Sequence, residues 1–157
     1  MARQPASRRQ FLSRSLAGVG SAWLAGNWPE ILAAHEHARH AVQTDPPAKF
    51  EFLTPDQATE VEAMAAQIIP TDDTPGAREA RVIYFIDRAL TTFDRDKQEL
   101  YRGGLRELQQ KCVEYTPAAG SFSKLSSVQQ IELLKTIEKG EFFEAVRVHT
   151  IIGFFAN

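Results

Sequence analysis

From residue 54 onward, apolar side chains recur at intervals of three and four residues, and this spacing limits the possible fold more than any other feature. Such intervals place the apolar side chains on one face of an α-helix, whereas a strand would need apolar and polar residues in alternation. The sequence contains no alternating run of useful length. We therefore expect an all-α fold, a small helical domain of about four to five helices over residues 51–157.

Local start and stop signals divide this region into helices. Thr54 and Gln57 form a capping box that begins one helix, and Pro70 is expected to end it. Ser126 and Gln129 form a second capping box further along the chain. Other helices are expected to begin at Thr74, near Asp94 and near Glu141.

Composition and charge limit the class of protein. The chain has 157 residues, which is enough for one domain, and 43% of them are hydrophobic, which supports a packed core. The net charge of −2 and the lack of a clustered basic face argue against nucleic-acid binding. Cys112 is the only cysteine, so the chain has neither an internal disulfide nor a haem-attachment motif, and we expect Cys112 to be a buried apolar residue.

The amino terminus carries an export motif. Ser7, Arg8, Arg9, Phe11 and Leu12 match the twin-arginine pattern, in which an arginine pair follows a serine and precedes a polar residue, Phe and Leu. This pattern directs folded proteins across the cytoplasmic membrane. The motif therefore predicts that the chain is exported in the folded state.

The segment after the arginine pair is only mildly apolar. Residues 15–24 are too short and too polar for a membrane span, which needs about 20 apolar residues. We assign residues 1–34 to the signal region. The nearest candidate for a cleavage site is Ala33-Ala34, although Leu32 stands where the small-x-small pattern requires a small residue. The signal is thus expected either to be cut near that point or to remain attached as an anchor.

Residues 35–50 are rich in His, Ala and Pro and are interpreted as a flexible linker. His35, His37 and His40 form an H-x-H-x-x-H run that could bind a metal ion. A solvated, mobile segment is the favoured interpretation, because a linker offers little support for a rigid metal site. We therefore assign no metal site.

Two further sets of side chains are candidates for catalytic groups. Asp72 and Asp73 are adjacent in a Pro-rich turn, where carboxylates usually form turns or face a helix N-terminus. His149 has no Ser or Cys nucleophile visibly paired with it, so we expect a structural histidine at an interface. No catalytic residue is assigned.

Three segments carry a resemblance to a known family. They are the Ile-Ile-Pro-Thr-Asp-Asp-Thr-Pro-Gly-Ala run at 68–77, the Phe-Ile-Asp run at 85–87 and the His-Thr-Ile-Ile-Gly-Phe-Phe run at 149–155. Together with the arginine pair they resemble the small subunit, subunit 3 or gamma, of the gluconate 2-dehydrogenase type. That family normally continues into a Gly-rich, aromatic stretch, whereas this chain stops at Asn157, so we expect its domain to be C-terminally incomplete.

The resemblance implies a non-catalytic role in an oxidoreductase complex. In such complexes a large subunit binds FAD and oxidises a sugar or polyol, and a cytochrome c subunit passes the electrons on. The small subunit supplies the signal for the Tat translocase, carries no cofactor and escorts the large subunit to the periplasmic side of the cytoplasmic membrane. The residues expected to bind the partner are Pro70, Asp72, Pro75, Gly76, His149, Phe154 and Phe155. The alternative is an independent exported binding protein or enzyme, with a metal ion bound by the histidine cluster.

Overall fold

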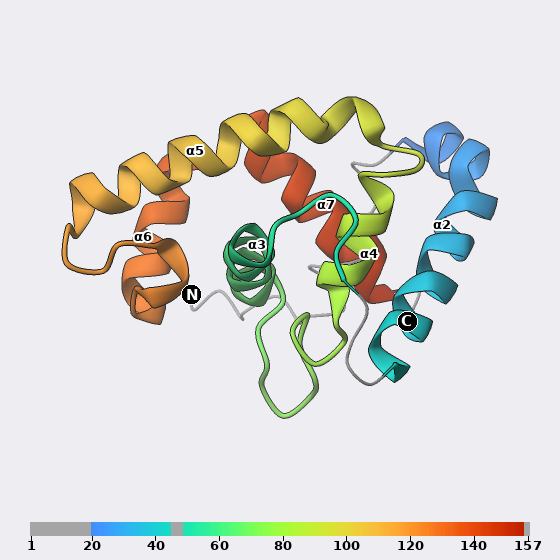
Figure 1. The fold of residues 1–157 in the computed structure, drawn as a ribbon, viewed down its shortest axis with the longest axis horizontal. Coiled ribbons are helices and arrows are strands. Elements are labelled where there is room, and N and C mark those ends of the chain that lie inside the picture. The colour runs from blue at the N-terminus through green and yellow to red at the C-terminus, as the bar shows by residue number, and fades with distance from the viewer. Residues whose placement is uncertain (1–19, 45–48, 156–157) are drawn as a thin grey trace, which may run out of the picture.

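The structure is a computed structural model that describes residues 20–44 and 49–155 of the chain (Figure 1). These residues form six α-helices and two short 3-10 helices, with no strand among them, which confirms the all-α prediction. The elements are α2 (Ser21–Gln43), α3 (Pro55–Ile68), α4 (Val82–Ala89), η1 (Arg95–Lys97), α5 (Gln98–Tyr115), η2 (Phe122–Lys124), α6 (Ser127–Ile137) and α7 (Glu141–Phe155). The export motif, Ser7 to Leu12, lies outside the described residues.

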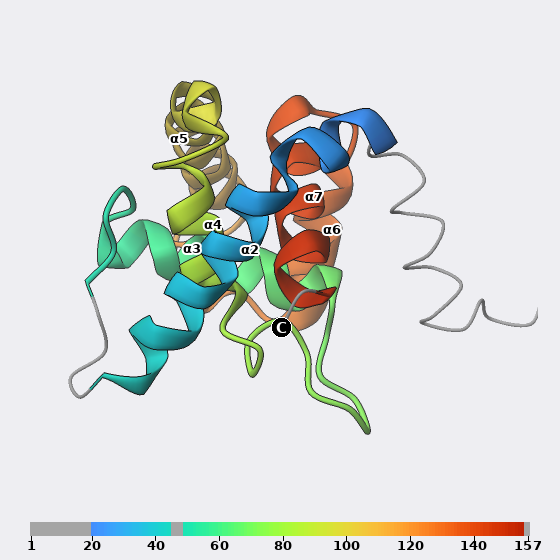
Figure 2. The same cartoon turned by 90° about the vertical axis from the view of Figure 1, so that its right-hand side faces the viewer.

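Helix α4 lies at the centre of the arrangement and contacts α2, α3 and α7. Helix α5 runs along one edge of the molecule and packs on α6 and α7. Helix α2 lies on one side of the body, and α6 lies at the opposite end (Figures 1 and 2). The main core fills the space between α3, α4, α5 and α7; its largest fully buried side chains include Met64, Ile69, Ile86, Leu90, Tyr101, Leu108 and Ile151.

Both predicted capping boxes are present. The Thr54 hydroxyl accepts a hydrogen bond from the Gln57 N–H at 3.2 Å, and the Gln57 side chain accepts one from the Thr54 N–H at 3.0 Å. Ser126 and Gln129 make the same reciprocal pair. These contacts satisfy N–H groups that have no partner within the helix. The starts of α3 and α6 could therefore be predicted from the sequence.

The helix expected to begin at Thr74 begins later, at Val82. The backbone of Arg81 adopts a left-handed conformation with φ of 52°, which a continuous α-helix excludes. The residues before Arg81 instead form turns, because their side chains and backbone N–H groups make hydrogen bonds within the loop between α3 and α4. The prediction of a helix start at Thr74 was therefore wrong by about two turns of helix.

The linker expected at residues 35–50 must be corrected for residues 35–43, which continue helix α2. The helix buries Ile31, Ala34, His35 and Ala41, which recur at helical intervals. Three of these four side chains are small or polar, so the buried face has little of the apolar signal that marks a packed helix. Helix α2 also crosses the boundary expected at residue 34 between signal and linker.

Candidate functional site

The loop between α3 and α4, residues 69–81, protrudes from the body of the molecule (Figures 1 and 2). The Asp72 carboxylate accepts hydrogen bonds from both the N–H and the hydroxyl of Thr74, each at 2.8 Å. This is the local turn that an aspartate side chain forms with its own backbone. The prediction that Asp72 is a turn former is confirmed.

Glu79 closes the base of this loop. Its carboxylate accepts hydrogen bonds from the Thr71 hydroxyl at 2.6 Å and from the Gly76 N–H at 2.8 Å. These hydrogen bonds, the first from Thr71, hold the pKa of Glu79 below its usual value because they favour the charged carboxylate. The loop is thus fixed in shape although most of it is exposed.

Gly76 is buried at the same base, where the chain folds back on itself. A Cβ at Gly76 would lie 2.6 Å from the Thr71 nitrogen and 2.7 Å from the Ile69 oxygen, both backbone atoms. Only glycine therefore permits this approach without a backbone shift. Gly76 therefore allows the two ends of the loop to pack closely. Pro70, Asp72 and Pro75 lie on the exposed part of the loop.

The C-terminal end of α7 lies on the same side of the molecule as this loop (Figures 1 and 2). Gly153 packs against Val82 and Phe85 of α4, directly after the loop. Phe154 is half-buried, whereas Phe155 exposes 46% of its surface. Four of the seven predicted partner-binding residues are exposed: Pro70, Asp72, Pro75 and Phe155.

His149 lies elsewhere, inside the body. Its Nε2 is 2.7 Å from an oxygen of Asp94, and its Nδ1 is 2.8 Å from the Tyr101 hydroxyl. All three side chains are buried. Burial and the charge of Asp94 raise the pKa of Tyr101 well above its usual value, so this hydroxyl stays protonated and donates to Nδ1.

This network connects the residue before η1 with α5 and α7. With Tyr101 donating to Nδ1, the ring donates from Nε2 to Asp94, so both ring nitrogens are hydrogen-bonded. A cavity of about 510 Å³ opens beside Asp94 and His149 and is lined by charges of both signs, including Lys97, Lys139 and Glu144. His149 is buried and connects α7 to Asp94 and to α5, so it is not exposed as the prediction of a partner-binding residue requires.

The three histidines of the possible metal site do not come together. His35 is buried against α4, His37 is half-buried with its Nε2 3.4 Å from a Glu51 oxygen, and His40 is exposed. Among the described residues, no group of three or more His, Cys, Asp or Glu side chains is placed to hold a metal ion. The structure thus gives no support to the metal-binding alternative.

Sequence reasoning missed the role of Asp87, the acid of the Phe-Ile-Asp run. Its buried carboxylate accepts three backbone N–H groups, from Glu51 at 2.6 Å, Phe52 at 3.0 Å and Leu53 at 2.8 Å. It thereby fixes the segment that leads into α3 on the face of α4. The signal in the sequence was a lone acid inside an otherwise apolar helical stripe.

Comparison with known proteins matches the sequence of this chain to one family model. The family model described as Gluconate 2-dehydrogenase subunit 3 matches residues 55–157, which is more than half of the chain. The chain belongs to the gluconate 2-dehydrogenase subunit 3 family. No curated protein and no solved structure gives a significant match.

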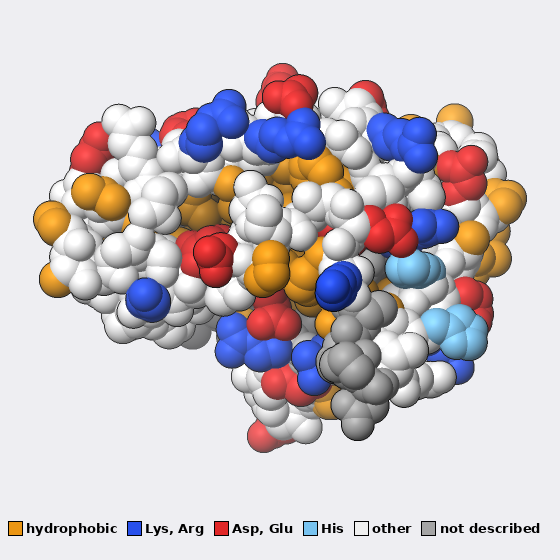
Figure 3. All heavy atoms as spheres, in the orientation of Figure 1, with side chains coloured by type: hydrophobic (Ala, Val, Ile, Leu, Met, Phe, Trp, Pro, Cys, Tyr) orange, Lys and Arg blue, Asp and Glu red, His pale blue; other side chains and the backbone are white. Residues whose placement is uncertain are grey.

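The match to subunit 3 covers both the exposed loop and α7, and it begins after α2. The family name implies membership in a dehydrogenase complex of several subunits. Within the part of the chain that the structure describes, no helix is both long and apolar enough to cross a membrane. On the face in Figure 3, Lys and Arg side chains are interspersed with Asp and Glu, and no basic patch gathers there.

Proposed function

We propose that this protein is the non-catalytic small subunit of a sugar or polyol dehydrogenase complex. In this proposal it supplies the twin-arginine signal to the Tat translocase and escorts a folded, FAD-containing large subunit to the periplasm. A cytochrome c subunit completes the complex at the cytoplasmic membrane. The observation that carries the proposal is the family match over residues 55–157.

The proposed contact surface, here called the loop face, consists of Pro70, Asp72, Pro75 and Phe155. The loop is held by Asp72 and Glu79 before any partner binds, so little conformational entropy is lost on association. An exposed phenylalanine at a helix end supplies apolar area of the kind that anchors interfaces. The remaining predicted partner-binding residues are not part of this surface. Gly76 and His149 are buried, and Phe154 is half-buried with its ring against that of Phe155.

The proposal places the redox chemistry in the partner, with FAD as its cofactor. The titratable groups inside this chain support that division. Tyr101 and His149 are hydrogen-bonded to each other. Burial raises the pKa of Cys112 to about 11, so its thiol stays protonated at neutral pH. These groups have structural tasks and are poor candidates for acid–base or nucleophilic catalysis.

The escort role is tested by conservative changes in the signal. The chain, with Arg8→Lys and Arg9→Lys introduced together, is co-expressed with the FAD-containing large subunit of the proposed complex. We expect periplasmic dehydrogenase activity to be lost, while Arg14→Lys, outside the motif, keeps it. If the flavoprotein reaches the periplasm at the normal level despite the double change, the escort role is refuted.

A further inference from the structure

Helix α2 begins inside the region assigned to the export signal, contains Pro29, and extends to Gln43. The candidate cleavage point, Ala33-Ala34, lies in the middle of this helix. Ile31 and Ala34, just before the cut, are 0% and 1% exposed, and His35, just after it, is 4% exposed. The segment expected to be removed is therefore part of a packed element.

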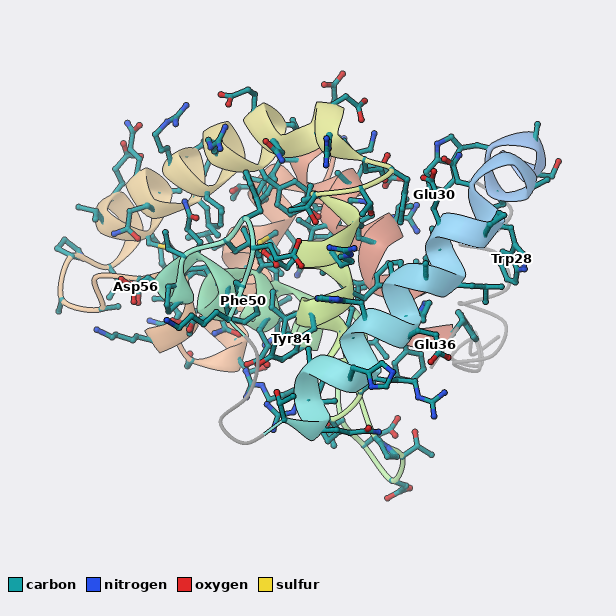
Figure 4. All side chains as sticks on the ribbon, turned by 45° about the vertical axis from the view of Figure 1, so that its right-hand side comes forward. Trp28, Glu30, Glu36, Phe50, Asp56 and Tyr84 are labelled. Carbon is teal, nitrogen blue, oxygen red and sulfur yellow. The ribbon has the colours of Figure 1, made fainter. Side chains whose placement is uncertain are left out.

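The buried face of α2 forms a second hydrophobic cluster with the body. Ile31 and Ala34 pack with Phe85 and Ala89 of α4 and with Ile152 of α7. Nearer the start of the helix, the Trp23 ring meets the Phe93 ring edge-on at 6.0 Å between centroids. Trp28 points away from the body on the opposite face (Figure 4). Helix α2 thus has one buried face and one exposed face, both before and after the candidate cleavage point.

Polar contacts reinforce the docking of α2. The His35 ring stacks on the Phe85 ring at 4.4 Å between centroids, and His37 approaches Glu51, which also pairs with Arg88 of α4 at 2.8 Å. These contacts connect the helix to α4 and to the segment before α3. Both histidines lie after Ala34, so the contacts extend along the helix from Trp23 to His37.

A cut after Ala34 conflicts with this packing. Proteolytic cleavage occurs at exposed, loosely held backbone, and a helical backbone must first unfold locally to reach a protease. Unwinding α2 at this point removes Ile31 and Ala34 from Phe85 and Ile152. Cleavage would remove Trp23 and Ile31 for good and expose apolar surface on α4 and α7.

We propose that the exported subunit retains all of α2, so that Ala33-Ala34 is not the processing site. Any cut falls on the N-terminal side of Ser21, or the signal stays attached. This inference rests on the proposed twin-arginine export for its biological setting. Its structural content, that α2 belongs to the folded domain, is independent of the route.

The direct test is the intact mass of the chain recovered from the periplasm when it is produced with its flavoprotein partner. We expect a mass that includes residues 21–43. A chain that begins at His35 would overturn the inference. If no chain reaches the periplasm, the proposed export fails instead, and the following measurement decides the inference.

The second test needs no export and uses the full chain purified from the cytoplasm. Hydrogen exchange of residues 31–41 should be as slow as that of α4, because both belong to one packed unit. Ile31→Ala should lower Tm by roughly 5–10 °C, while the exposed neighbour Leu32→Ala should change it by less than about 2 °C. Ala34→Glu and its exposed neighbour Ala33→Glu form a second matched pair with the same expectation. Exchange in 31–41 at the rate of a free peptide, or equal effects within each pair, would refute the docking of α2.

Discussion

At the scale of single residues, the chain places several polar groups inside its core and satisfies them with specific partners. Asp87 accepts three backbone N–H groups, and Asp94, His149 and Tyr101 form a continuous buried network. A buried polar group that loses its partner costs far more than the net gain from making the bond. The stability of the domain should therefore depend strongly on these few side chains.

Asp94→Ala should destabilise the protein by about 2–4 kcal/mol, because it leaves the His149 Nε2–H buried without an acceptor. Urea unfolding of the purified chain measures this difference in the free energy of unfolding. Asp96→Ala, at an exposed position two residues away, is the matched control and should have little effect. A loss below about 0.5 kcal/mol for Asp94→Ala would show that the network does not stabilise the fold.

His35 should make stability depend on pH. Burial lowers its pKa below the ordinary 6.5, although a backbone hydrogen bond with Ile152 partly opposes this. The unfolded chain therefore takes up the proton first, so the contribution of His35 to stability is complete above 6.5 and falls as the pH drops below that value.

Replacing His35 by Gln should reduce the loss of Tm between about pH 7.5 and pH 5.5, because the glutamine does not titrate. His40→Gln, at an exposed site of the same helix, should leave the pH profile of the wild type unchanged. Identical pH profiles for His35→Gln and the wild type would contradict a buried neutral histidine at this position.

At the scale of elements, much of the helix arrangement could be predicted from sequence, and the failures have physical causes. The capping boxes that begin α3 and α6 are local, and so is the start of α7 at Glu141. Helix α2 escaped prediction because its contacts with α4 and α7 lie far away in the chain. The partners Asp94 and His149 are 55 residues apart, and nothing in the local sequence predicts their contact.

The close packing of α7 on α4 depends on Gly153. A Cβ at this position would lie 2.7 Å from the Phe85 ring and 2.9 Å from a Val82 methyl group. Gly153→Ala should therefore cost roughly 1–3 kcal/mol in the free energy of unfolding through overpacking. Gly103→Ala in α5 is the control: its nearest neighbour would be an Arg106 side-chain atom at 4.0 Å, so we expect a gain of about 0.5–1 kcal/mol. A neutral Gly153→Ala would show that α4 and α7 are not this closely packed in solution.

At the scale of the whole molecule, exposure decides which residues can belong to the proposed loop face. Sequence resemblance selected the residues of the loop face, and the structure divides them by exposure. Pro70, Asp72, Pro75 and Phe155 are exposed, whereas Gly76 and His149 are buried. That division could not be predicted, because exposure depends on how α7 and the loop pack against α4.

Phe155→Ser should weaken binding of the flavoprotein subunit by about tenfold or more and leave Tm nearly unchanged, since this side chain is largely exposed. Val113→Ser is a matched control, because Val113 has the same 46% exposure but lies near the end of α5, on another part of the molecule. Titration of the labelled chain with the purified flavoprotein gives both affinities. Equal affinities for the two variants would exclude Phe155 from the interface.

The central claim is that this chain forms a complex with a FAD-containing dehydrogenase. The most direct measurement captures the full chain with an antibody from the periplasmic fraction of cells that also express the proposed flavoprotein subunit. We expect the flavoprotein to be captured as well, with FAD in an amount comparable to that of the chain. Capture of the chain alone, without flavin, while active flavoprotein is present in the same fraction, would contradict the account.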